Sequence, residues 1–428
     1  MSGDSLRYIP LTYDHADSQA SALRLVLSIK PDWEGSGNNI EFVRFTDGIT
    51  NTLLKIINRK PGLTDEQIDN EAILMRAYGN HTEILIDRER ETRSHTLLAQ
   101  HGLAPPLLAR FKNGLLYCFI RGHVTSPADL TKPSVWRGVA RRLAQWHASL
   151  PITQSNESSQ FSDSAEESPT EDCCDLAKPN GASKAQPETN ITPIRPRQAG
   201  PNMWTVLQKW ILALPALTEE QRLRQRSLQG ELERLVDELD DGSGIGDNGL
   251  VFAHCDLLSA NVIVQPQTAT NGHANGHEHS KEVQFIDYEY ATPSPAAFDI
   301  ANHFAEWGGY DCDYNMLPTR SVRRDFLTEY VKSFSQHGGK GIDANKEQHE
   351  IVEKLFQDVD RFRGIPGFYW GVWALIQATI SQIDFDYASY AEVRLGEYWA
   401  WRRESDAGYS MDAKEEKPLR ERRWAQEA

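Results

Sequence analysis

Residues 251–264, VFAHCDLLSANVIV, place His254, Asp256 and Asn261 at fixed offsets between two runs that are rich in valine and isoleucine. Short β-branched runs predict strands, and the polar residues between them predict a connecting loop. A further strand-like run, VQFIDYEYA, follows and puts Asp287 near its end. An aspartate and an asparagine at a turn can serve only to cap it. The order of these residues, with a second acid downstream, argues instead for a reactive site.

The chemistry that suits this order of residues is phosphoryl transfer. The spacing H-x-D-x-x-x-x-N is that of a kinase catalytic loop, in which the aspartate orients the attacking hydroxyl and the asparagine binds a metal ion. We expect Asp256 and His254 to be the catalytic pair, with Asp256 as the base and His254 stabilising the loop by hydrogen bonds. Asn261 and Asp287 are the expected ligands of Mg²⁺, which would bridge to the phosphates of ATP.

The chain before this motif has the pattern of a small sheet. An amphipathic helix is expected at 18–30. Residues 40–60 and 107–120 are predicted hairpins, the second with Asn-Gly at its turn, and residues 71–79 are a further strand. One helix, ending near Gly102, is predicted to be inserted into this sheet.

After residue 122 the pattern becomes mostly helical. We therefore predict an α/β (α+β) fold of the protein-kinase-like, two-lobed kind. It has a small β-rich N-lobe at 1–122, which binds the nucleotide, and a mostly helical C-lobe at 123–403. Two inserts, at about 155–202 and 265–282, contain few large apolar residues and are expected to be disordered. Residues 404–428 are expected to be a charged, frayed tail.

The composition limits the partners of this chain. A formal net charge of −16 argues against nucleic-acid binding, which depends on Lys and Arg contacts to phosphates. A cationic substrate would meet no general repulsion. Five cysteines without paired spacing fit a reducing compartment. Without a basic-plus-apolar leader or a run long enough to span a membrane, a cytoplasmic location is expected, and a homodimer is left open.

These motifs also resemble those of a known family. HCDLLSANVIV followed by VQFIDYEYATPSPAAFDIANHFAEW resembles the choline/ethanolamine kinase family, relatives of protein kinases and aminoglycoside phosphotransferases. The family signature is H-N-D-x-x-x-x-N, then I-D-[FY]-E-Y, then F-D-I-x-N-H-F-x-E. The resemblance extends from about residue 40 to 403, apart from the inserts. The chain departs from the pattern at Cys255, where the family often has asparagine; we expect this change to be tolerated, because that side chain is not the base.

The resemblance implies roles for further residues. FTDGITN resembles the phosphate-covering loop of the family, although its spacing alone would predict only a hairpin loop. Arg76 would hold phosphates by bidentate hydrogen bonds, with Glu91 as its helix-borne partner; without the family, a surface ion pair would be favoured. The expected ATP-binding residues are Thr46, Asp47, Gly48, Asn51, Arg76 and Glu91. The expected structural support of the catalytic loop comes from Glu289, Asp299 and His303.

An amino-alcohol acceptor needs negative charge or aromatic faces around its ammonium group. The late helical region has aromatic pairs at helical spacing, a pattern that more often belongs to a core. The resemblance favours a ligand site instead, because the family lines its ammonium pocket with aromatic residues from the matching helix. The expected acceptor-binding residues are Glu306 as the counter-charge, with Tyr310, Trp370, Trp373 and Tyr390.

The choice of acceptor rests on the resemblance alone. Leu257-Leu258 and Gly308-Gly309 are more similar to the ethanolamine branch of the family. This implies ATP-dependent phosphorylation of ethanolamine to phosphoethanolamine, the first step of the CDP-ethanolamine route to phosphatidylethanolamine. A choline kinase or a dual choline/ethanolamine kinase stays open, since both hydrogen-bond acceptors and aromatic faces are available. A pseudokinase that binds nucleotide without chemistry is the alternative of another class, and the intact Asp256, Asn261 and Asp287 argue against it.

Overall fold

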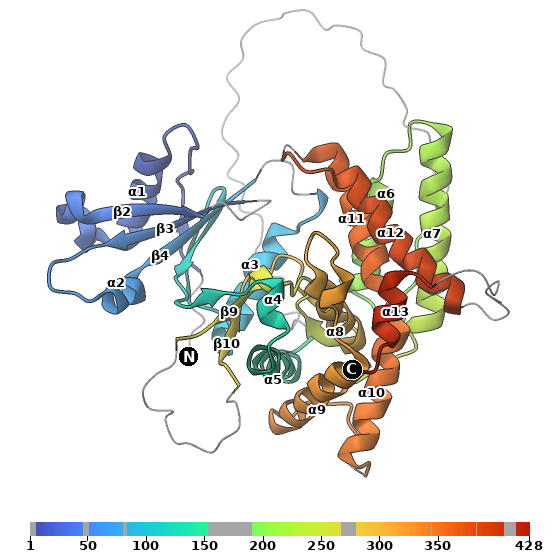
Figure 1. Cartoon of the computed structure of the whole chain (residues 1–428). Helices are drawn as coiled ribbons and strands as arrows, with labels where there is room; N and C mark the ends of the chain where they lie inside the picture. The colour runs from blue at the N-terminus through green and yellow to red at the C-terminus, as the bar shows by residue number, and fades with distance from the viewer. Residues whose placement is uncertain are drawn as a thin grey trace, which may run out of the picture.

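The computed structural model has a sheet-based N-lobe and a helical C-lobe, seen at the left and right of Figure 1. This two-lobed architecture confirms the fold class predicted from the sequence. The structure describes the following residues: 6–45, 51–79, 84–152, 191–266, 280–343, 345–381, 383–405 and 417–428.

The N-lobe is built on a six-stranded sheet with the order β1-β5-β6-β4-β3-β2, antiparallel except where β1 lies parallel to β5. Its strands are β1 (Tyr8–Ile9), β2 (Ile40–Phe45), β3 (Asn51–Asn58), β4 (Ile73–Tyr78), β5 (Leu107–Phe111) and β6 (Gly114–Cys118). Its helices are α1 (Ser18–Ile29), α2 (Asp65–Glu71) and α3 (Arg88–Gln100), with a 3₁₀ segment at Pro31–Asn39. Both predicted hairpins, the further strand and the helix before Gly102 are confirmed.

Helix α2 was not predicted from the sequence. It is short, begins with a capping box between Thr64 and Gln67, and buries only Ile68. One buried residue gives no helical periodicity, so the capping box was the single available signal. The helix places Asp69 beside Lys55 of β3, at 2.5 Å.

The alternation of side chains along β4 determines which of them face the C-lobe. Met75 and Ala77 pack in the N-lobe core with Leu25 and Val26 of α1. Because successive strand residues point to opposite faces of a sheet, Arg76 points away from that core. It is nevertheless buried, because α3 and a segment of the C-lobe lie against it.

The C-lobe consists mainly of helices packed around one large apolar core. The helices are α4 (Pro127–Leu130), α5 (Pro133–Ser149), α6 (Met203–Ala213), α7 (Glu219–Leu239), α8 (Ala296–Ala305), α9 (Arg320–Gln336), α10 (Gln348–Phe362), α11 (Ile365–Ile380), α12 (Tyr387–Ser405) and α13 (Leu419–Ala425). Short 3₁₀ turns occupy Ser259–Asn261, Glu306–Gly308 and Tyr314–Met316.

Small strands carry the motif that opened the sequence analysis. They are β7 (His123–Val124), β8 (Val251–Ala253), β9 (Val262–Val264), β10 (Val283–Phe285) and β11 (Thr292–Ser294). Strands β9 and β10 pair antiparallel with Val262 opposite Phe285, as expected for a hairpin whose connection carries the second insert. Strand β8 pairs with β11, so the catalytic loop passes between two separate small sheets.

Two boundaries predicted from composition are wrong. Residues 191–202 are not part of a disordered insert, since the backbone N–H of Ile194 donates to Gln208 and that of Arg197 donates to Asp240. Residues 417–428 are not a frayed tail, because α13 buries Trp424 against the C-lobe. Composition misses both, since long-range partners satisfy the polar groups. The rest of the first insert (153–190), most of the second (267–279) and residues 406–416 lie outside the described residues.

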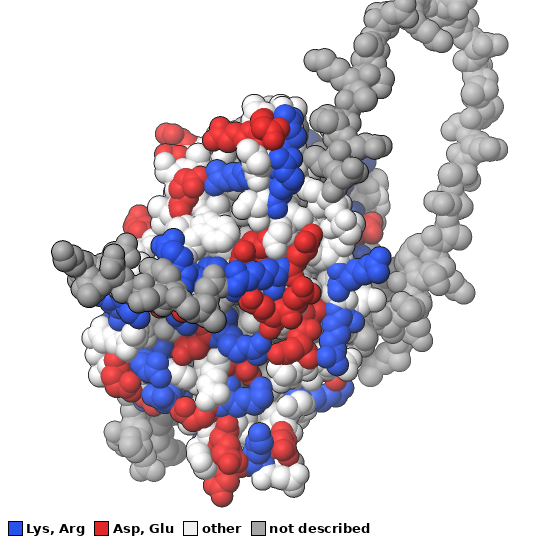
Figure 2. Space-filling model, turned by 90° about the vertical axis from the view of Figure 1, so that its right-hand side faces the viewer, with Lys and Arg blue, Asp and Glu red and all other residues white. Residues whose placement is uncertain are grey.

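One face of the molecule shows how its charged side chains are distributed. On the face that lies at the right of Figure 1, acidic and basic side chains are intermixed, as Figure 2 shows. Exposed ion pairs of the C-lobe include Arg224 with Glu392 and Arg361 with Asp241. Among the described residues, no helix is long and apolar enough to cross a membrane.

Candidate active site

One buried carboxylate fixes the backbone of the catalytic loop between β8 and β9. Asp299 of α8 accepts hydrogen bonds from the backbone N–H groups of His254 and Cys255, at 2.9 and 2.8 Å. Its other contact is His147 Nε2 of α5, at 2.9 Å. Burial opposes the ionised form, but the hydrogen bond and charge of His147 outweigh it and lower the pKa of Asp299. The loop backbone is therefore fixed by an ionised group that solvent does not reach.

Two further side chains of α8 complete this support. Asn302 Nδ2 donates to the carbonyl of Cys255 at 3.0 Å, and His303 Nδ1 lies 2.8 Å from the carbonyl of Leu257. Burial lowers the pKa of His303 to about 4, so the ring is neutral and donates from Nδ1. These contacts fit the supporting roles predicted for Asp299 and His303, whereas Asn302 stood out in the sequence as part of the same motif and not as a support of the loop.

His254 is placed to stabilise the loop. Its ring is buried, Nε2 lies 3.0 Å from the carbonyl of Ile286, and Nδ1 accepts from the backbone N–H of Asp256 at 3.3 Å. Burial lowers the pKa of this ring. Both ring nitrogens are thus engaged, which ties the catalytic loop to the segment that carries Asp287.

Both segments contain a strained residue next to the proposed chemistry. Cys255 and Asp287 adopt left-handed backbone conformations, with φ of 64° and 65°. Such conformations are unfavourable for residues other than glycine and persist where surrounding contacts impose them. At Cys255 those contacts are the hydrogen bonds to Asp299 and from Asn302. Asparagine, which the resemblance implies at this position, tolerates such a conformation better than cysteine.

Asp256 and Asn261 contact each other within the catalytic loop. Asn261 Nδ2 donates to the carbonyl of Asp256 at 2.8 Å and approaches its carboxylate at 3.3 Å. Burial and the negative charges of Asp287, Glu306 and Glu289 raise the pKa of Asp256 well above its usual value. A carboxyl with a raised pKa accepts a proton more readily than an exposed one.

The phosphate side of the site is a cluster of two arginines and three carboxylates. Arg76 Nη1 lies 3.5 Å from Glu91 and 2.8 Å from Asp287, and Arg76 Nη2 contacts Glu289. Burial lowers the pKa of Arg76, but the three carboxylates outweigh this and raise it. The pair Arg76–Glu91, implied by the resemblance, is therefore present. It is buried rather than on the surface.

Arg88, at the start of α3, joins the same cluster and was not predicted. It lies 3.0 Å from Glu91 and 3.4 Å from Glu289, and Nη2 donates to Asn51 Oδ1 at 3.2 Å. Asn51 also donates to Glu289, at 3.2 Å. Burial and the charge of Asp287 raise the pKa of Glu289 to about 7. The other residues expected in the phosphate-covering loop, Thr46, Asp47 and Gly48, lie outside the described residues.

The expected acceptor side is an aromatic cluster connected to the catalytic loop. Trp370 Nε1 donates to Asn302 Oδ1 at 2.8 Å, and Asn302 in turn holds the carbonyl of Cys255. Trp373 Nε1 donates to the hydroxyl of Tyr290 at 2.8 Å, and the two tryptophan rings are 5.5 Å apart in a T-shaped arrangement. Tyr290 belongs to the IDYEY motif, so a sequence signal for it existed.

Tyr310 and Tyr390 extend this cluster toward solvent. Their ring centroids are 6.4 Å apart, and Phe385 packs against both. Tyr390 is buried, whereas 45% of Tyr310 is exposed. Burial raises the pKa of Tyr310, and so do the negative charges of Asp256 and Glu306, which places this ring near both acids. Aromatic faces and two carboxylates therefore converge on one region.

Glu306, the counter-charge expected from the sequence, is itself paired with an arginine. Its carboxylate lies 3.1 Å from Arg394 of α12, and both side chains are buried. Burial raises the pKa of Glu306, while Arg394 acts in the opposite direction. An arginine on a late helix gives no sequence signal for this pairing, because nothing local relates it to residue 306.

Comparisons with known proteins identify the family of this chain. The sequence profile of the family described as choline/ethanolamine kinase matches residues 42–399. The chain belongs to this family. An ethanolamine kinase 1 of Mus musculus is 32% identical over 90% of this chain and 90% of that one. A probable ethanolamine kinase of Nematostella vectensis is 34% identical over 92% and 96%. The solved structure of a Plasmodium vivax ethanolamine kinase is 22% identical, with a TM-score of 0.63 over 89% of each chain, and shares the fold.

Membership of a choline/ethanolamine kinase family makes ATP the co-substrate. The residues present also suit a magnesium ion, which takes oxygen ligands from one or two protein groups and completes its shell with water and phosphate. Asp287 Oδ1 is a buried carboxylate oxygen that accepts no well-aligned hydrogen bond; its contact is the ion pair with Arg76. Asp287 and Asn261 supply carboxylate and amide oxygens of the required hardness.

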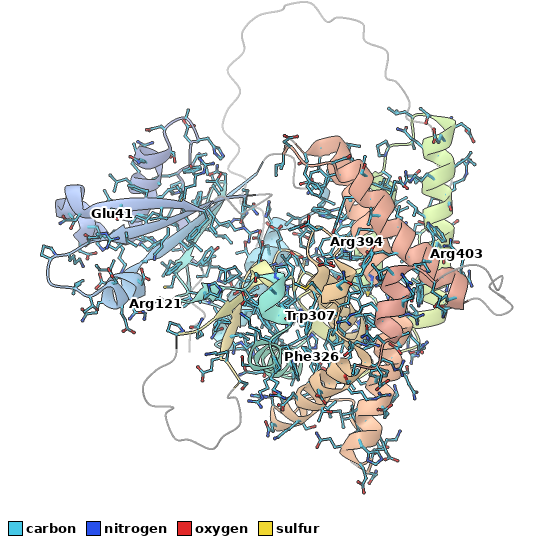
Figure 3. The ribbon with its side chains drawn as sticks, in the orientation of Figure 1. Glu41, Arg121, Trp307, Phe326, Arg394 and Arg403 are labelled. Carbon is cyan, nitrogen blue, oxygen red and sulfur yellow. The ribbon has the colours of Figure 1, made fainter. Side chains whose placement is uncertain are left out.

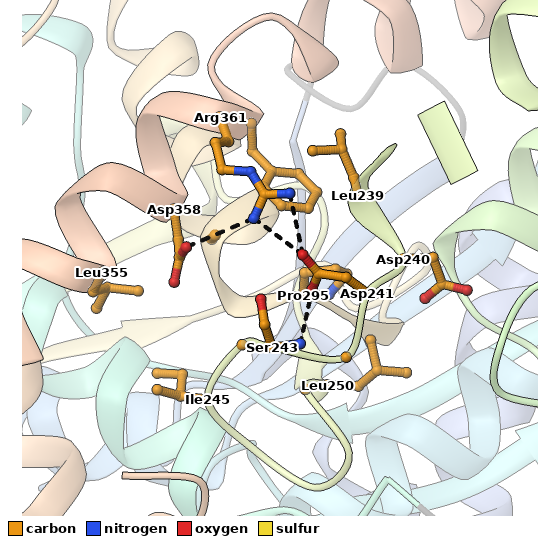
Figure 4. A pocket seen from close by; sticks show the side chains of 15 residues that line it. Leu239, Asp240, Asp241, Ser243, Ile245, Leu250, Pro295, Leu355, Asp358 and Arg361 are labelled. Carbon is orange, nitrogen blue, oxygen red and sulfur yellow. Dashed lines mark hydrogen bonds and ion pairs between the residues drawn. The ribbon is translucent and has the colours of Figure 1, made fainter. Parts of the chain in front are cut away.

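A small cavity elsewhere in the C-lobe is not a second substrate site. It lies between the loop after α7 and helix α10, where Arg361 pairs with Asp241 (Figure 4). Its volume is about 20 Å³. A cavity of that size holds roughly one water molecule. No residue of the catalytic loop lines it.

Proposed function

We propose that this protein phosphorylates ethanolamine, with ATP as the phosphoryl donor and Mg²⁺ as the metal. The observation that carries the proposal is the joint presence of Asp256, Asn261 and Asp287 in one kinase-like arrangement, with Asp256 beside an aromatic and acidic region. Relatives named as ethanolamine kinases, at 32% and 34% identity over most of the chain, support this acceptor.

In this proposal Asp256 orients the acceptor hydroxyl and takes its proton as the oxygen attacks the γ-phosphorus in line. The raised pKa of Asp256 makes its carboxylate a stronger base than an exposed one. Magnesium, held by Asn261 and Asp287, neutralises charge on the phosphates when bound. Arg76 and Asn51 hold the phosphates from the N-lobe, at 1–122, with Glu91 and Glu289 positioning Arg76.

The acceptor binds on the C-lobe side, at 123–403, in the region of Trp370, Trp373, Tyr310 and Tyr390. Aromatic faces attract the ammonium group, and Glu306 supplies negative charge. A primary ammonium also donates hydrogen bonds, which the carboxylates can accept. Choline lacks those donors and would use the aromatic faces alone, so some activity on choline is compatible with the site.

The decisive experiment compares kcat/KM for ethanolamine and choline in a coupled assay of ADP release, with wild-type protein and Asp256→Ala side by side. We expect a preference for ethanolamine and a loss of about 10²- to 10⁴-fold in Asp256→Ala. A preference for choline overturns the acceptor assignment. Substantial turnover by Asp256→Ala overturns the base assignment, and nucleotide binding without turnover by the wild type indicates a pseudokinase.

Two further expectations stay predictions. A cytoplasmic location follows from the composition and is tested by fractionation of the source cells. Assembly as a homodimer is tested by light scattering of the purified protein across a range of concentrations.

A further inference from the structure

A chain of alternating charges runs through the interior of the C-lobe from the acceptor side to the C-terminal helix. Glu306 pairs with Arg394 at 3.1 Å, Arg394 with Glu397 at 3.4 Å, and Glu397 with Arg420 of α13 at 3.7 Å. Arg420 then pairs with Glu421 at 2.8 Å. All five residues are buried, and Figure 3 labels Arg394 within the helical interior.

Stability alone does not account for such a chain. Taking charges out of water is costly, and apolar residues of similar volume often replace a buried ion pair without loss. The chain is also kept in a specific geometry. The backbone carbonyl of Arg394 would lie 2.5 Å from a Cβ at Gly367, so α11 and α12 pack too closely there for any larger residue. Tyr314 donates to Glu397 at 2.9 Å and fixes the next link.

Arg394 touches two residues that the proposed function places around the acceptor. Besides its ion pair with Glu306, its Nη1 lies 3.5 Å from the hydroxyl of Tyr390, and its guanidinium lies 5.8 Å from the centre of that ring. A single buried cation thus fixes both the carboxylate and one aromatic face. Since Arg394 is shared between Glu306 and Glu397, it neutralises the Glu306 carboxylate only in part and leaves it able to attract a cationic ligand.

We propose that Arg394 is a positioning residue for the acceptor: it holds the Glu306 carboxylate and the Tyr390 ring in place, and α13 holds Arg394 through Glu397 and Arg420. This inference rests on the proposed function, because it concerns the same acceptor site. It gives the C-terminal segment, whose composition suggested a frayed tail, a part in substrate binding.

The test measures KM for ethanolamine and for ATP separately in Arg394→Met, which keeps the apolar stem and removes the charge. We expect KM for ethanolamine to rise about 10- to 100-fold, as activity or affinity falls when a group that supports a metal ligand is removed, with KM for ATP changed less than about twofold. Arg394→Lys, which retains the charge but not the fork of donors, should recover part of the loss.

Arg402→Met is the matched control. Arg402 lies on the same helix, is buried, and pairs with Glu231 and Glu238 at 2.6 Å each. Its loss should lower the unfolding temperature and leave KM for ethanolamine unchanged. If Arg394→Met does not fold, Arg394→Lys and Arg420→Met decide the matter, the latter by a smaller rise in KM for ethanolamine alone.

The outcomes separate the two proposals. A wild-type protein that does not phosphorylate ethanolamine overturns the proposed function. A wild type that does so, combined with an unchanged KM for ethanolamine in the Arg394 variants, overturns the positioning role. An equal rise in both KM values, or the same rise in Arg402→Met, also overturns it. An unchanged KM in Arg420→Met removes α13 from the proposal.

Discussion

The two halves of the candidate site are stabilised in different ways. In the C-lobe half, hydrogen bonds to Asp299 and from Asn302 and His303 fix the backbone of the catalytic loop, and all three side chains are fully buried. In the N-lobe half, Arg76 is shared among carboxylates, two of which, Asp287 and Glu289, come from the other lobe. The first half is complete without a ligand, whereas the second consists of charges that a ligand can compete for.

This difference suggests how ATP would enter. If Asp287 is the magnesium ligand that we propose, Arg76 would lose Asp287 as a partner when the metal binds and could contact the phosphates instead. Such an exchange would cost little, because each charge that loses a protein partner would gain one from the ligand. Asp256, the base that we propose in the C-lobe half, would make no such exchange, so its position can be set during folding.

Removing Asp299 should have the largest effect on stability. Asp299→Ala leaves the N–H groups of His254 and Cys255 and the ring of His147 without their acceptor. We expect the free energy of unfolding to fall by about 3–5 kcal/mol, as when one member of a buried pair is removed. Urea denaturation measures this. Asp247→Ala, which breaks the exposed pair with Lys340, is the control and should cost at most about 1 kcal/mol. If Asp299→Ala lowers the free energy of unfolding as little as this control, the C-lobe half of the site is not held by its buried hydrogen bonds in the way described above.

Replacing Arg76 should affect activity more than stability, because Arg88 remains as a cation beside Glu91 and Glu289. Arg76→Met removes the cation that three carboxylates now surround, and we expect kcat/KM for ATP to fall by about 10²-fold through lost charge stabilisation. Arg76→Lys keeps a charge without the bidentate geometry and should be intermediate. Steady-state kinetics with varied ATP, together with thermal unfolding of both variants, tests this. A loss of stability equal to that of Asp299→Ala would show that both halves are rigid frameworks.

The same contrast explains what the sequence could predict. The catalytic loop was predicted from spacing, because His254, Asp256 and Asn261 lie within eight residues and their roles follow from local geometry. Arg76 and Glu91 were predicted only through the resemblance, since a strand residue and a helix residue at that separation have no fixed relation. Arg88 and Arg394 were missed, because a paired buried arginine and a solvated one look alike in a sequence.

Composition gave wrong predictions of disorder for segments that long-range contacts hold in place. The segment 191–202 and helix α13 are polar and charged, yet their partners lie far away in the chain, as with Arg363 and Glu421 at 3.1 Å. The aromatic pairs of the late helices show the opposite limit. Their helical spacing fits a core and a ligand site equally well, and their hydrogen bonds to Asn302 and Tyr290 became visible only in three dimensions.

Acid should destabilise the protein through buried histidines in both halves. Burial lowers the pKa of His95 and of His303 to about 4, from a usual 6.5. The unfolded chain therefore binds more protons between these values, so this contribution is complete above pH 6.5 and is lost as the pH falls toward 4. Each histidine contributes a slope of about 1.4 kcal/mol per pH unit within that range.

Urea denaturation at several pH values measures this slope. His95 Nε2 lies 2.9 Å from the carbonyl of Pro105, and the amide of His95→Gln can make the same hydrogen bond without titrating. In this variant the free energy of unfolding should fall less steeply with falling pH, by the slope that one histidine contributes. Above pH 7 its stability should equal that of the wild type. An unchanged slope in His95→Gln would contradict the assignment for that residue.

The smallest effect on stability is expected at Cys255, because relief of backbone strain and burial of a larger side chain act in opposite directions. Cys255→Asn relieves part of the strain of a left-handed backbone, since asparagine adopts φ near 64° more readily. It also brings a larger amide into a fully buried site, where Ser294 Oγ lies 3.4 Å and the carbonyl of Thr292 3.9 Å from Cys255 Sγ. Because these two groups can satisfy part of the amide, we expect stability to change by less than about 1 kcal/mol, the net value of a typical hydrogen bond. Cys255→Asp places a charge in the same volume and should be clearly destabilising. If Cys255→Asn is equally damaging, the cavity is shaped for sulfur and backbone strain is not what distinguishes this position.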